Sequence, residues 1–400
     1  MLIVQKFGGS SVADAEKITR VAGIIADTYC EGHDVVVVLS AQGDTTDDLI
    51  EKAQEINASP SKREMDVLLS TGEQISISLM AMALEKLGLP VISLTGWQLR
   101  ITTDSTYGSA RIREVDTERL RRELDARRIV LVAGFQGVTN FGDITTLGRG
   151  GSDTTAVAIA AVLHADSCQI YTDVEGVYTA DPRKVENAQK LQEITYDEML
   201  ELASLGAQVL HNRSVEMAKR YGVGLEVLSS YVRAPGTKVK EVVKKMEQMK
   251  ISGIAKDTNV ARLAVVGLPD EPGVAFKVFQ IMAKAKINVD IILQSMGRDN
   301  TNDISFTVSK ADCDAAREAI EEYREVIGFD RVDVDQNIAK VSIVGSGMIT
   351  SSGIAALMFE ALSDAKINIK MITTSEIKVS VLIDADLADT AVSAIHNKFF

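Results

Sequence analysis

The stretch whose residues are best suited to bind a ligand or do chemistry is Gly148–Asp153, which holds three glycines, Arg149, Ser152 and Asp153. It runs into the apolar segment 156–163, which is typical of a buried helix. The glycines permit close backbone approach, and Ser152 or Asp153 is expected to cap the helix. Amides at a helix N-terminus beside a guanidinium favour an anion, although a ligand-free Gly-rich turn also fits the segment taken alone.

Lys6 is the second candidate. It lies at the end of a predicted strand, residues 2–7, and precedes Gly8, Gly9 and Ser10 and then a helical pattern from about residue 13 to residue 26. Strand, glycine turn and helix present backbone amides to phosphate, and ligands of open α/β sheets bind where strands end. The spacing is not that of a Walker A loop. A solvated surface lysine is the alternative.

Further polar residues follow other predicted strands or interrupt apolar helices. Ser40 and Thr45 lie in the polar loop after the β-branched run 34–39, where a polar substrate or a helix cap would explain them equally. Glu73 follows a helix-interior glycine in apolar surroundings, which suggests a site for a cationic group. Thr172 and Asp173 end another strand. Downstream, Tyr178 could flank a base and Arg183 could reach phosphate, although a turn explains most of their neighbours.

The elements that must position these residues divide the chain in two. Strands alternate with helices over about 240 residues, which predicts a layered α/β domain. Beyond Pro235-Gly236 two similar units follow, each βαββαβ in outline, and both contain Ala-Lys-Ile-Asn, at 285–288 and 365–368. The second unit lacks a fourth strand. We therefore expect Ile251–Ala255 to complete its sheet, so that the first unit is inserted within the second.

Composition excludes several classes of protein. The formal net charge of −13 argues against nucleic-acid or membrane partners. Three scattered cysteines predict neither a disulfide framework nor a metal site, and they favour a reducing compartment. The N-terminus shows no leader pattern, and no uninterrupted apolar run approaches the length of a membrane span, so we expect a cytoplasmic protein.

Four motifs, in order, together with the duplicated tail resemble the aspartate kinase family over essentially the whole chain. They are Lys6–Val12, Ser70–Glu73, Thr146–Asp153, and Tyr171–Asp173 with Val177–Arg183. The resemblance implies a three-layer amino-acid-kinase fold with a mainly parallel sheet in residues 1–245. Two ferredoxin-like ACT units would follow, the first with its linker in 246–335 and the second in 336–400. The length resembles the monofunctional enzymes.

The resemblance also implies a reaction, in which ATP phosphorylates the β-carboxylate of L-aspartate on the way to lysine, threonine and methionine. Lys6 and Asp153 would be catalytic, and Mg²⁺ would be held mainly by the nucleotide phosphates. Arg149 would bind the substrate α-carboxylate and Glu73 its ammonium. The remaining substrate contacts would be Ser40, Thr45 and Ser152, and ATP would contact Lys6, Phe7, Gly8, Gly9, Ser10, Thr172, Asp173, Tyr178 and Arg183.

Regulation is implied in the same way. Members of the family pair their ACT units between chains and bind lysine or threonine there, so we expect a homo-oligomer, with room for a shorter regulatory subunit. The expected effector contacts are Asn288, Val289, Asp290, Gln294, Asn368 and Thr374, although the two asparagines could simply shape turns. Departures from the family pattern are Gln42, Gln208, Leu228 and Lys370. The rival interpretations are a kinase for a related carboxylate and a catalytically silent amino-acid sensor.

Overall fold

The computed structural model describes the chain except residues 207–208, 244–250, 298–300 and 349–350. Gln208 and the expected domain boundary at 245/246 therefore lie outside the described residues. The chain forms two compact units: Met1–Tyr178 with Lys190–Met246, and Thr179–Gln189 with Glu247–Phe400. Each unit is described by itself.

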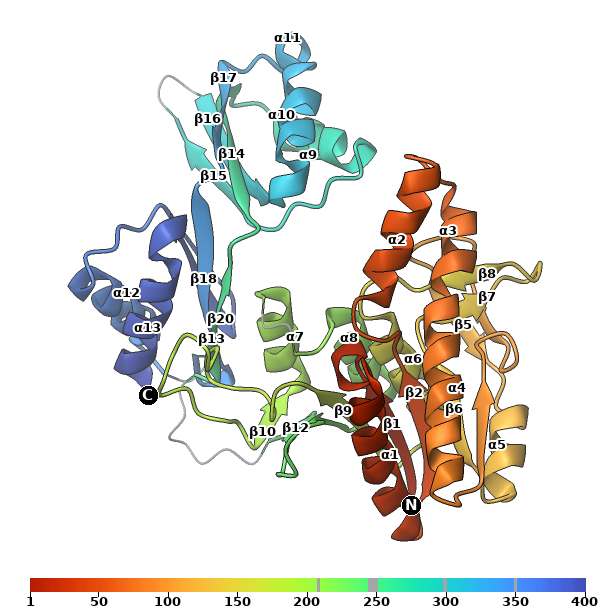
Figure 1. Ribbon diagram of the computed structural model, residues 1–400. Coiled ribbons are helices and arrows are strands. Elements are labelled where there is room, and N and C mark those ends of the chain that lie inside the picture. The colour runs from red at the N-terminus through yellow and green to blue at the C-terminus, as the bar shows by residue number, and fades with distance from the viewer. Residues whose placement is uncertain (207–208, 244–250, 298–300, 349–350) are drawn as a thin grey trace. The chain divides into compact units, whose positions relative to one another are not determined.

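The first unit is built on an eight-stranded sheet of order β10-β12-β11-β9-β1-β2-β6-β3 (Figure 1). From β11 to β3 every neighbouring pair is parallel, and only β11 and β12 run antiparallel, so the expected mainly parallel sheet is confirmed. The strands are β1 (Leu2–Phe7), β2 (Asp34–Leu39), β3 (Val91–Leu94), β6 (Ile129–Ala133), β9 (Ser167–Thr172), β10 (Glu193–Thr195), β11 (Leu225–Ser229) and β12 (Thr237–Lys240).

Helices cover the sheet because its central strands are apolar on both faces; all five residues of β6, for example, are buried. Helices α1 (Ala15–Cys30) and α4 (Thr71–Lys86) share one core with β1, β2, β6 and β9. Eleven of the thirteen residues of α6 (Gly151–Leu163) are buried, as expected for a helix that is apolar nearly all round. The other helices are α2 (Thr45–Ile56), α3 (Lys62–Leu69), α5 (Glu118–Asp125), α7 (Tyr196–Ser204) and α8 (Asn212–Tyr221).

A second, four-stranded sheet in this unit has the order β5-β4-β7-β8. Its strands are β4 (Ile101–Thr103), β5 (Ile112–Val115), β7 (Gln136–Val138) and β8 (Ile144–Thr146). Strand β8 ends two residues before Gly148, so this sheet delivers the glycine-rich stretch to the start of α6.

By length and composition alone, the stretch Lys62–Lys86 could cross a membrane. It comprises α3 and α4, however, and the buried side chains of α4 (Ile77, Met80 and Leu84) pack into the sheet core. Core helices of globular domains satisfy the same test.

The second unit contains two four-stranded sheets, β15-β16-β14-β17 and β13-β18-β20-β19. Strand β13 (Gly253–Asp257) overlaps the stretch expected to complete the second repeat, and it pairs antiparallel with β18 in that repeat's sheet. The first repeat therefore lies in sequence between two adjacent strands of the second. The other strands are β14 (Ala261–Pro269), β15 (Ile292–Met296), β16 (Thr301–Val308), β17 (Arg331–Asp335), β18 (Ile338–Val344), β19 (Met371–Thr374) and β20 (Lys378–Asp384).

The repeated Ala-Lys-Ile-Asn sequence has a structural explanation. Helices α9 (Val274–Lys284) and α12 (Ile354–Asp364) both end at its alanine, and Lys286 and Lys366 have φ of 59° and 57°. The next amides, from Ile287 and Ile367, donate back into the helices at 3.0 and 2.9 Å. Both repeats thus end their first helix in the same left-handed cap. The remaining helices are α10 (Cys313–Glu321), α11 (Arg324–Ile327) and α13 (Ala388–Phe399).

The segment Thr179–Gln189, which the sequence placed in the kinase half, belongs to the second compact unit. Ala180 and Val185 are buried in the core of the second repeat. The Thr179 hydroxyl contacts Nε2 of the buried His396 on α13 at 2.9 Å. Burial lowers the pKa of His396. A segment that leaves one unit between Tyr178 and Lys190 is therefore folded into the other.

Candidate active site

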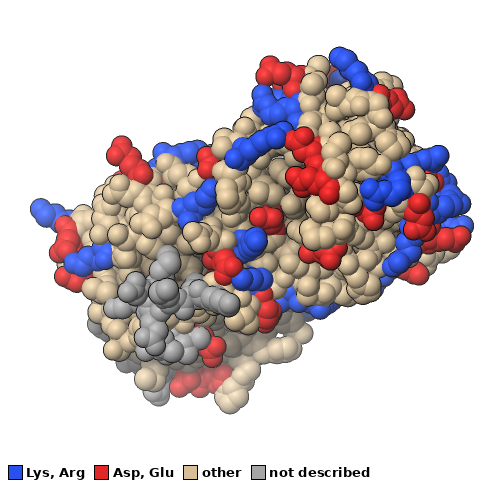
Figure 2. All heavy atoms as spheres, turned by 90° about the horizontal axis from the view of Figure 1, so that it is seen from below, with Lys and Arg blue, Asp and Glu red and all other residues tan. Residues whose placement is uncertain are grey.

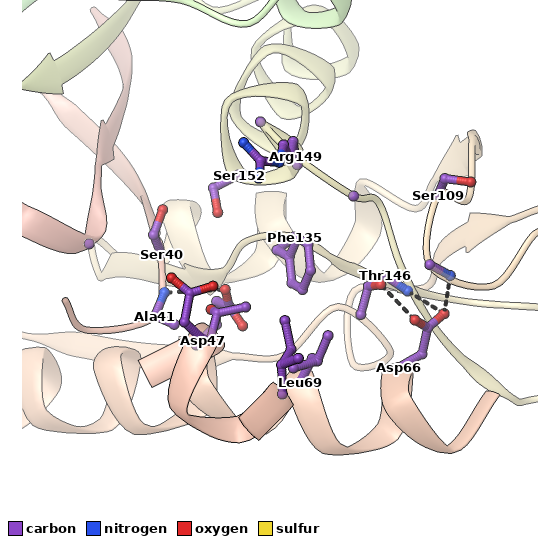
Figure 3. Close-up of a pocket in the computed structure, with 18 of the residues that line it drawn as sticks. Ser40, Ala41, Asp47, Asp66, Leu69, Ser109, Phe135, Thr146, Arg149 and Ser152 are labelled. Carbon is purple, nitrogen blue, oxygen red and sulfur yellow. Dashed lines mark hydrogen bonds between the residues drawn. The ribbon is translucent and has the colours of Figure 1, made fainter. Parts of the chain in front are cut away.

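A cavity of about 830 Å³ lies in the first unit. It is lined by the residues that follow β1, β2 and β6, the start of α6, and parts of α2, α3 and α4 (Figure 3). Carboxyl ends of neighbouring parallel strands form the ligand-binding edge of open α/β sheets. The lining includes eight of the residues predicted from sequence: Lys6, Gly8, Gly9, Ser40, Glu73, Arg149, Ser152 and Asp153.

Lys6 and Asp153 form an ion pair of 2.7 Å between Nζ and Oδ1, although they are separated by nearly 150 residues in sequence. The side chains are 13% and 11% exposed, so the pair is largely shielded from water but open to the cavity. Gly9 fits here because a Cβ at this position would lie 2.6 Å from the carbonyl oxygen of Ala41. The lysine ammonium is thus oriented beside a glycine loop, where a phosphate would fit.

The start of α6 differs in one respect from the sequence expectation. The N-cap is Gly150, with φ of 67°, and no side chain caps the helix, so the expected capping by Ser152 or Asp153 is wrong. Asp153 is instead turned to Lys6. A Cβ on Gly150 would come within 2.2 Å of the His211 ring, which explains the glycine. The N-terminus of α6 keeps its positive potential toward the cavity.

Glu73 is 3% exposed, and its Oε1 accepts a hydrogen bond of 3.2 Å from the Ala41 amide. Its Oε2 is buried without a partner among the described residues. Desolvation raises the pKa of this carboxyl to about 8. Gly72 is explained by contact, since a Cβ there would lie 2.8 Å from that of Ala41. The arrangement leaves one buried acceptor ready for a cation.

Arg149 is exposed, and the structure gives it no ion pair with any described residue. Figure 3 shows Arg149 and Ser152 together at the start of α6, with Ser40 on the neighbouring loop. Ser152 fits against Gly134, where a Cβ would lie 2.6 Å from the serine oxygen. Thr45 does not line the cavity; Thr46, the next residue, does. A guanidinium and an orphan carboxylate therefore face one cavity, as a zwitterionic ligand requires.

Several lining residues were missed by the sequence analysis. Phe135 follows β6 with φ of 66° and lies in the centre of the cavity view (Figure 3). Its position two residues after a buried strand was an available signal. Asp66 and Ser109 also line the cavity, but they come from a helix and a loop with no distinctive pattern.

The residues predicted to bind the nucleotide are more dispersed than those predicted to bind the amino-acid substrate. Phe7 is fully buried and stacks on Tyr171 with ring centroids 4.5 Å apart, so its side chain faces the core. Thr172 is the last residue of β9, and its hydroxyl donates a hydrogen bond of 3.0 Å to the carboxylate of Asp173. The backbone of Tyr178 forms an isolated antiparallel β-bridge with that of Lys190, and burial raises the pKa of the Tyr178 hydroxyl. Arg183 belongs to the second unit and pairs with Asp181. Ser10, Thr172, Asp173, Tyr178 and Arg183 do not line the cavity.

The predicted effector residues lie on the two repeats of the second unit. Asn288, Gln294, Asn368 and Thr374 are exposed, and Val289 is half-buried. Asp290 accepts a 2.5 Å contact from Lys340 of β18, a lysine side chain that is only 7% exposed. Lys370, which occupies the position equivalent to Asp290, pairs with Asp335 at 2.9 Å and Asp384 at 2.6 Å. The first repeat thus supplies the carboxylates Asp290 and Asp335, and the second repeat supplies the lysines that pair with them.

Comparison with known proteins identifies the class of protein. The amino acid kinase family model matches residues 1–229, and an ACT domain model matches residues 263–323 and 341–399. The chain belongs to the amino acid kinase family and carries two ACT domains. The aspartokinase of Bacillus sp. (strain MGA3) is 50% identical over 398 residues, covering all of this chain and 97% of that protein. Within the family, the chain belongs to the aspartokinases.

Two solved aspartokinase structures are similar to this chain over its whole length. E. coli aspartokinase III in complex with aspartate and ADP, in its R-state, is 28% identical with a TM-score of 0.84, and each chain is covered completely. The same enzyme in complex with lysine and aspartate, in its T-state, is 27% identical with a TM-score of 0.77, covering all of this chain and 99% of that one.

Proposed function

We propose that the chain catalyses transfer of the γ-phosphoryl group of ATP to the β-carboxylate of L-aspartate, giving 4-phospho-L-aspartate and ADP. The observation that carries the proposal is the orphaned Oε2 of buried Glu73 in the cavity that Arg149 also lines. An α-amino acid presents an ammonium and an α-carboxylate, which these two side chains complement. Lys6 lies in the same cavity and fits a phosphoryl group.

The residues support a mechanism based on positioning and charge. The substrate carboxylate is already ionised, so its oxygen attacks phosphorus without a general base, and the bond from phosphorus to the bridging oxygen of ADP breaks. Lys6, oriented by Asp153, neutralises charge on the transferred group and the leaving oxygen. Ser40 and Ser152 donate hydrogen bonds to the substrate. Thr172, Asp173 and Tyr178, which all belong to the first unit, contact the nucleotide.

Magnesium belongs to the same proposal. Among the described residues, no group of three or more His, Cys, Asp or Glu side chains could hold an ion without other ligands. Nucleotide phosphates are therefore the main ligands we propose, with the Asp153 carboxylate beside them. When bound, Mg²⁺ neutralises phosphate charge.

The decisive assay measures ADP release with aspartate, glutamate and acetylglutamate as acceptors. We expect turnover with aspartate alone, and Arg149→Ala should raise the KM for aspartate while Arg220→Ala, an exposed arginine on α8, should not. Preference for another acceptor would reassign the substrate. ADP release with none of the three would favour the silent sensor.

We also propose that the ACT domains bind lysine or threonine and pair between chains in a cytoplasmic homo-oligomer. The lysine complex of E. coli aspartokinase III supports the first part for a relative. All five residues of edge strand β15, including Ile292 and Met296, are exposed, which supports the second, because an open apolar edge favours pairing. The same edge would accept a shorter regulatory chain. Sedimentation and the ADP-release assay, each with and without lysine and threonine, singly and together, test both parts. Unchanged assembly and unchanged activity would contradict the regulation.

A further inference from the structure

Asp66 of α3 is a buried carboxylate with no role in the mechanism above. Its side chain is fully buried, and both of its oxygens are used. Oδ2 accepts hydrogen bonds of 2.9 Å from the amides of Gly108 and Thr146, and Oδ1 accepts one of 2.7 Å from the Thr146 hydroxyl (Figure 3). Its contacts thus join one helix to two separate segments at the wall of the cavity.

Arg213 of α8 binds the same two segments through the opposite groups. Its guanidinium donates to the carbonyl oxygens of Leu147 at 2.8 Å and Ala110 at 2.7 Å. The side chain is half-buried, and desolvation lowers its pKa. Both acceptors are backbone carbonyl oxygens, so Arg213 fixes the position of the main chain and makes no hydrogen bond here that depends on a neighbouring side chain.

The two segments are also joined directly, because the Ala110 amide donates to the Thr146 carbonyl at 2.9 Å. The carboxylate of Asp66 therefore binds amides of the two segments, and the guanidinium of Arg213 binds their carbonyls. The second segment continues through Gly148 to Arg149, and the first carries Ser109, which lines the cavity. These bonds hold the backbone that leads to Arg149 from two sides of the chain, through its amides and through its carbonyls.

We propose that Asp66 and Arg213 are positioning residues for Arg149, and through it for the α-carboxylate of the amino-acid substrate. This inference rests on the proposed function. A fold that needed only packing here would be served by apolar side chains, since buried ions carry a desolvation penalty. Asp66 and Arg213, with their hydrogen bonds to the two segments, form a polar clamp. Such a clamp suits a segment whose backbone must be placed accurately, because misplacement of a binding group by 1 Å can cost about 100-fold in rate.

The test compares two pairs of variants in the full chain. Asp66→Ala removes all three bonds, whereas in Asp66→Asn the amide oxygen still accepts from both amides and the NH₂ group donates to the Thr146 hydroxyl. Arg213→Ala removes both bonds, and Arg213→Lys keeps one. We expect the alanine variants to raise the KM for aspartate about 10- to 100-fold, with the Kd for ATP unchanged. Asp66→Asn should restore most of the loss and Arg213→Lys part of it.

A double-mutant cycle separates this inference from the proposed function. If Asp66 acts through Arg149, then Asp66→Ala should add little to the KM of Arg149→Ala. Glu123→Ala is the matched control, because Glu123 is a buried helical carboxylate paired with Arg119 and Arg128 that does not line the cavity. It should leave the KM for aspartate unchanged.

The inference is overturned if Arg149→Ala raises the KM for aspartate while Asp66→Ala and Arg213→Ala do not. It is also overturned if the clamp variants weaken ATP binding and aspartate binding equally, or if Asp66→Asn is no better than Asp66→Ala, since those outcomes describe a general loss of structure. A normal KM for aspartate in Arg149→Ala would instead refute the proposed substrate site.

Discussion

Glu73→Gln is expected to stabilise the free protein while weakening its binding of aspartate. The wild-type carboxyl is buried with one oxygen unpartnered, and its pKa is raised from 4.5 to about 8. An acid whose pKa is higher in the folded state favours folding at low pH. The stability of the wild type therefore falls as pH rises from 4.5 to 8, and the penalty is fully present above pH 8.

The size of the effect follows from the shift. A shift of this extent corresponds to roughly 4 to 5 kcal/mol as an upper bound. Glutamine keeps an acceptor for the Ala41 amide but leaves an NH₂ group buried, so we expect a net gain of about 1 to 3 kcal/mol above pH 8. Near pH 5 the wild-type carboxyl is protonated, and the two proteins should be almost equally stable.

Two measurements test the reasoning. Thermal or urea unfolding of the first unit between pH 5 and pH 9 should show a variant advantage that grows with pH, at about 2 to 4 °C per kcal/mol. Aspartate titrations should show wild-type affinity rising about tenfold per pH unit up to pH 8, a rise that the variant lacks. Glu85→Gln, an exposed change on the same helix, is the control. An advantage that is constant with pH, or normal aspartate affinity in the variant, would refute the assignment of Glu73.

Three further predictions concern other residues. Lys6→Ala should lower kcat about 100-fold or more while circular dichroism stays near wild type, because it removes the cation that faces the phosphoryl group in the cavity; near-normal turnover would contradict its role. Gly150→Ala should destabilise the protein by about 1 to 3 kcal/mol in urea unfolding, because its Cβ would lie 2.2 Å from His211 and φ is 67°; Gly23→Ala, where nothing lies within 4 Å, is the control. Under the proposed regulation by lysine or threonine, Lys340→Met should lower the effector concentration for half-inhibition, because it releases Asp290; an unchanged inhibition curve would show that Asp290 does not receive the effector.

The parts of the fold that sequence predicted are those with a strong local pattern. The runs 34–39 and 129–133 are buried strands because apolar β-branched residues suit a parallel sheet covered on both faces. Strand β13 could be placed in the second repeat because duplication exposed a missing strand. Gly72 was visible as an anomaly, but its cause, contact with Ala41, needed the tertiary structure.

The parts that sequence could not predict depend on contacts between distant segments. The backbone partners of Asp66 lie about 40 and 80 residues away in sequence, so nothing local distinguishes it from a surface aspartate on a helix. Ser152 and Asp153 have the composition of a helix cap, yet Gly150 takes the cap position and Asp153 turns to Lys6. The segment 179–189 reads as an ordinary turn, and only the core formed with Ile254 and Val392 shows where it belongs.

The insertion of one repeat within the other sets an order for biosynthesis. Strand β13 leaves the ribosome first, but its partner β18 follows only after residues 258–337 have been made. Until then Ile251 and Ile254 have no sheet to join, whereas the first repeat already holds all its own strands. A nascent chain would therefore complete its inner module before its outer one. A fragment beginning after Asp257 would keep the inner module intact but expose the edge of β18, a surface prone to aggregation.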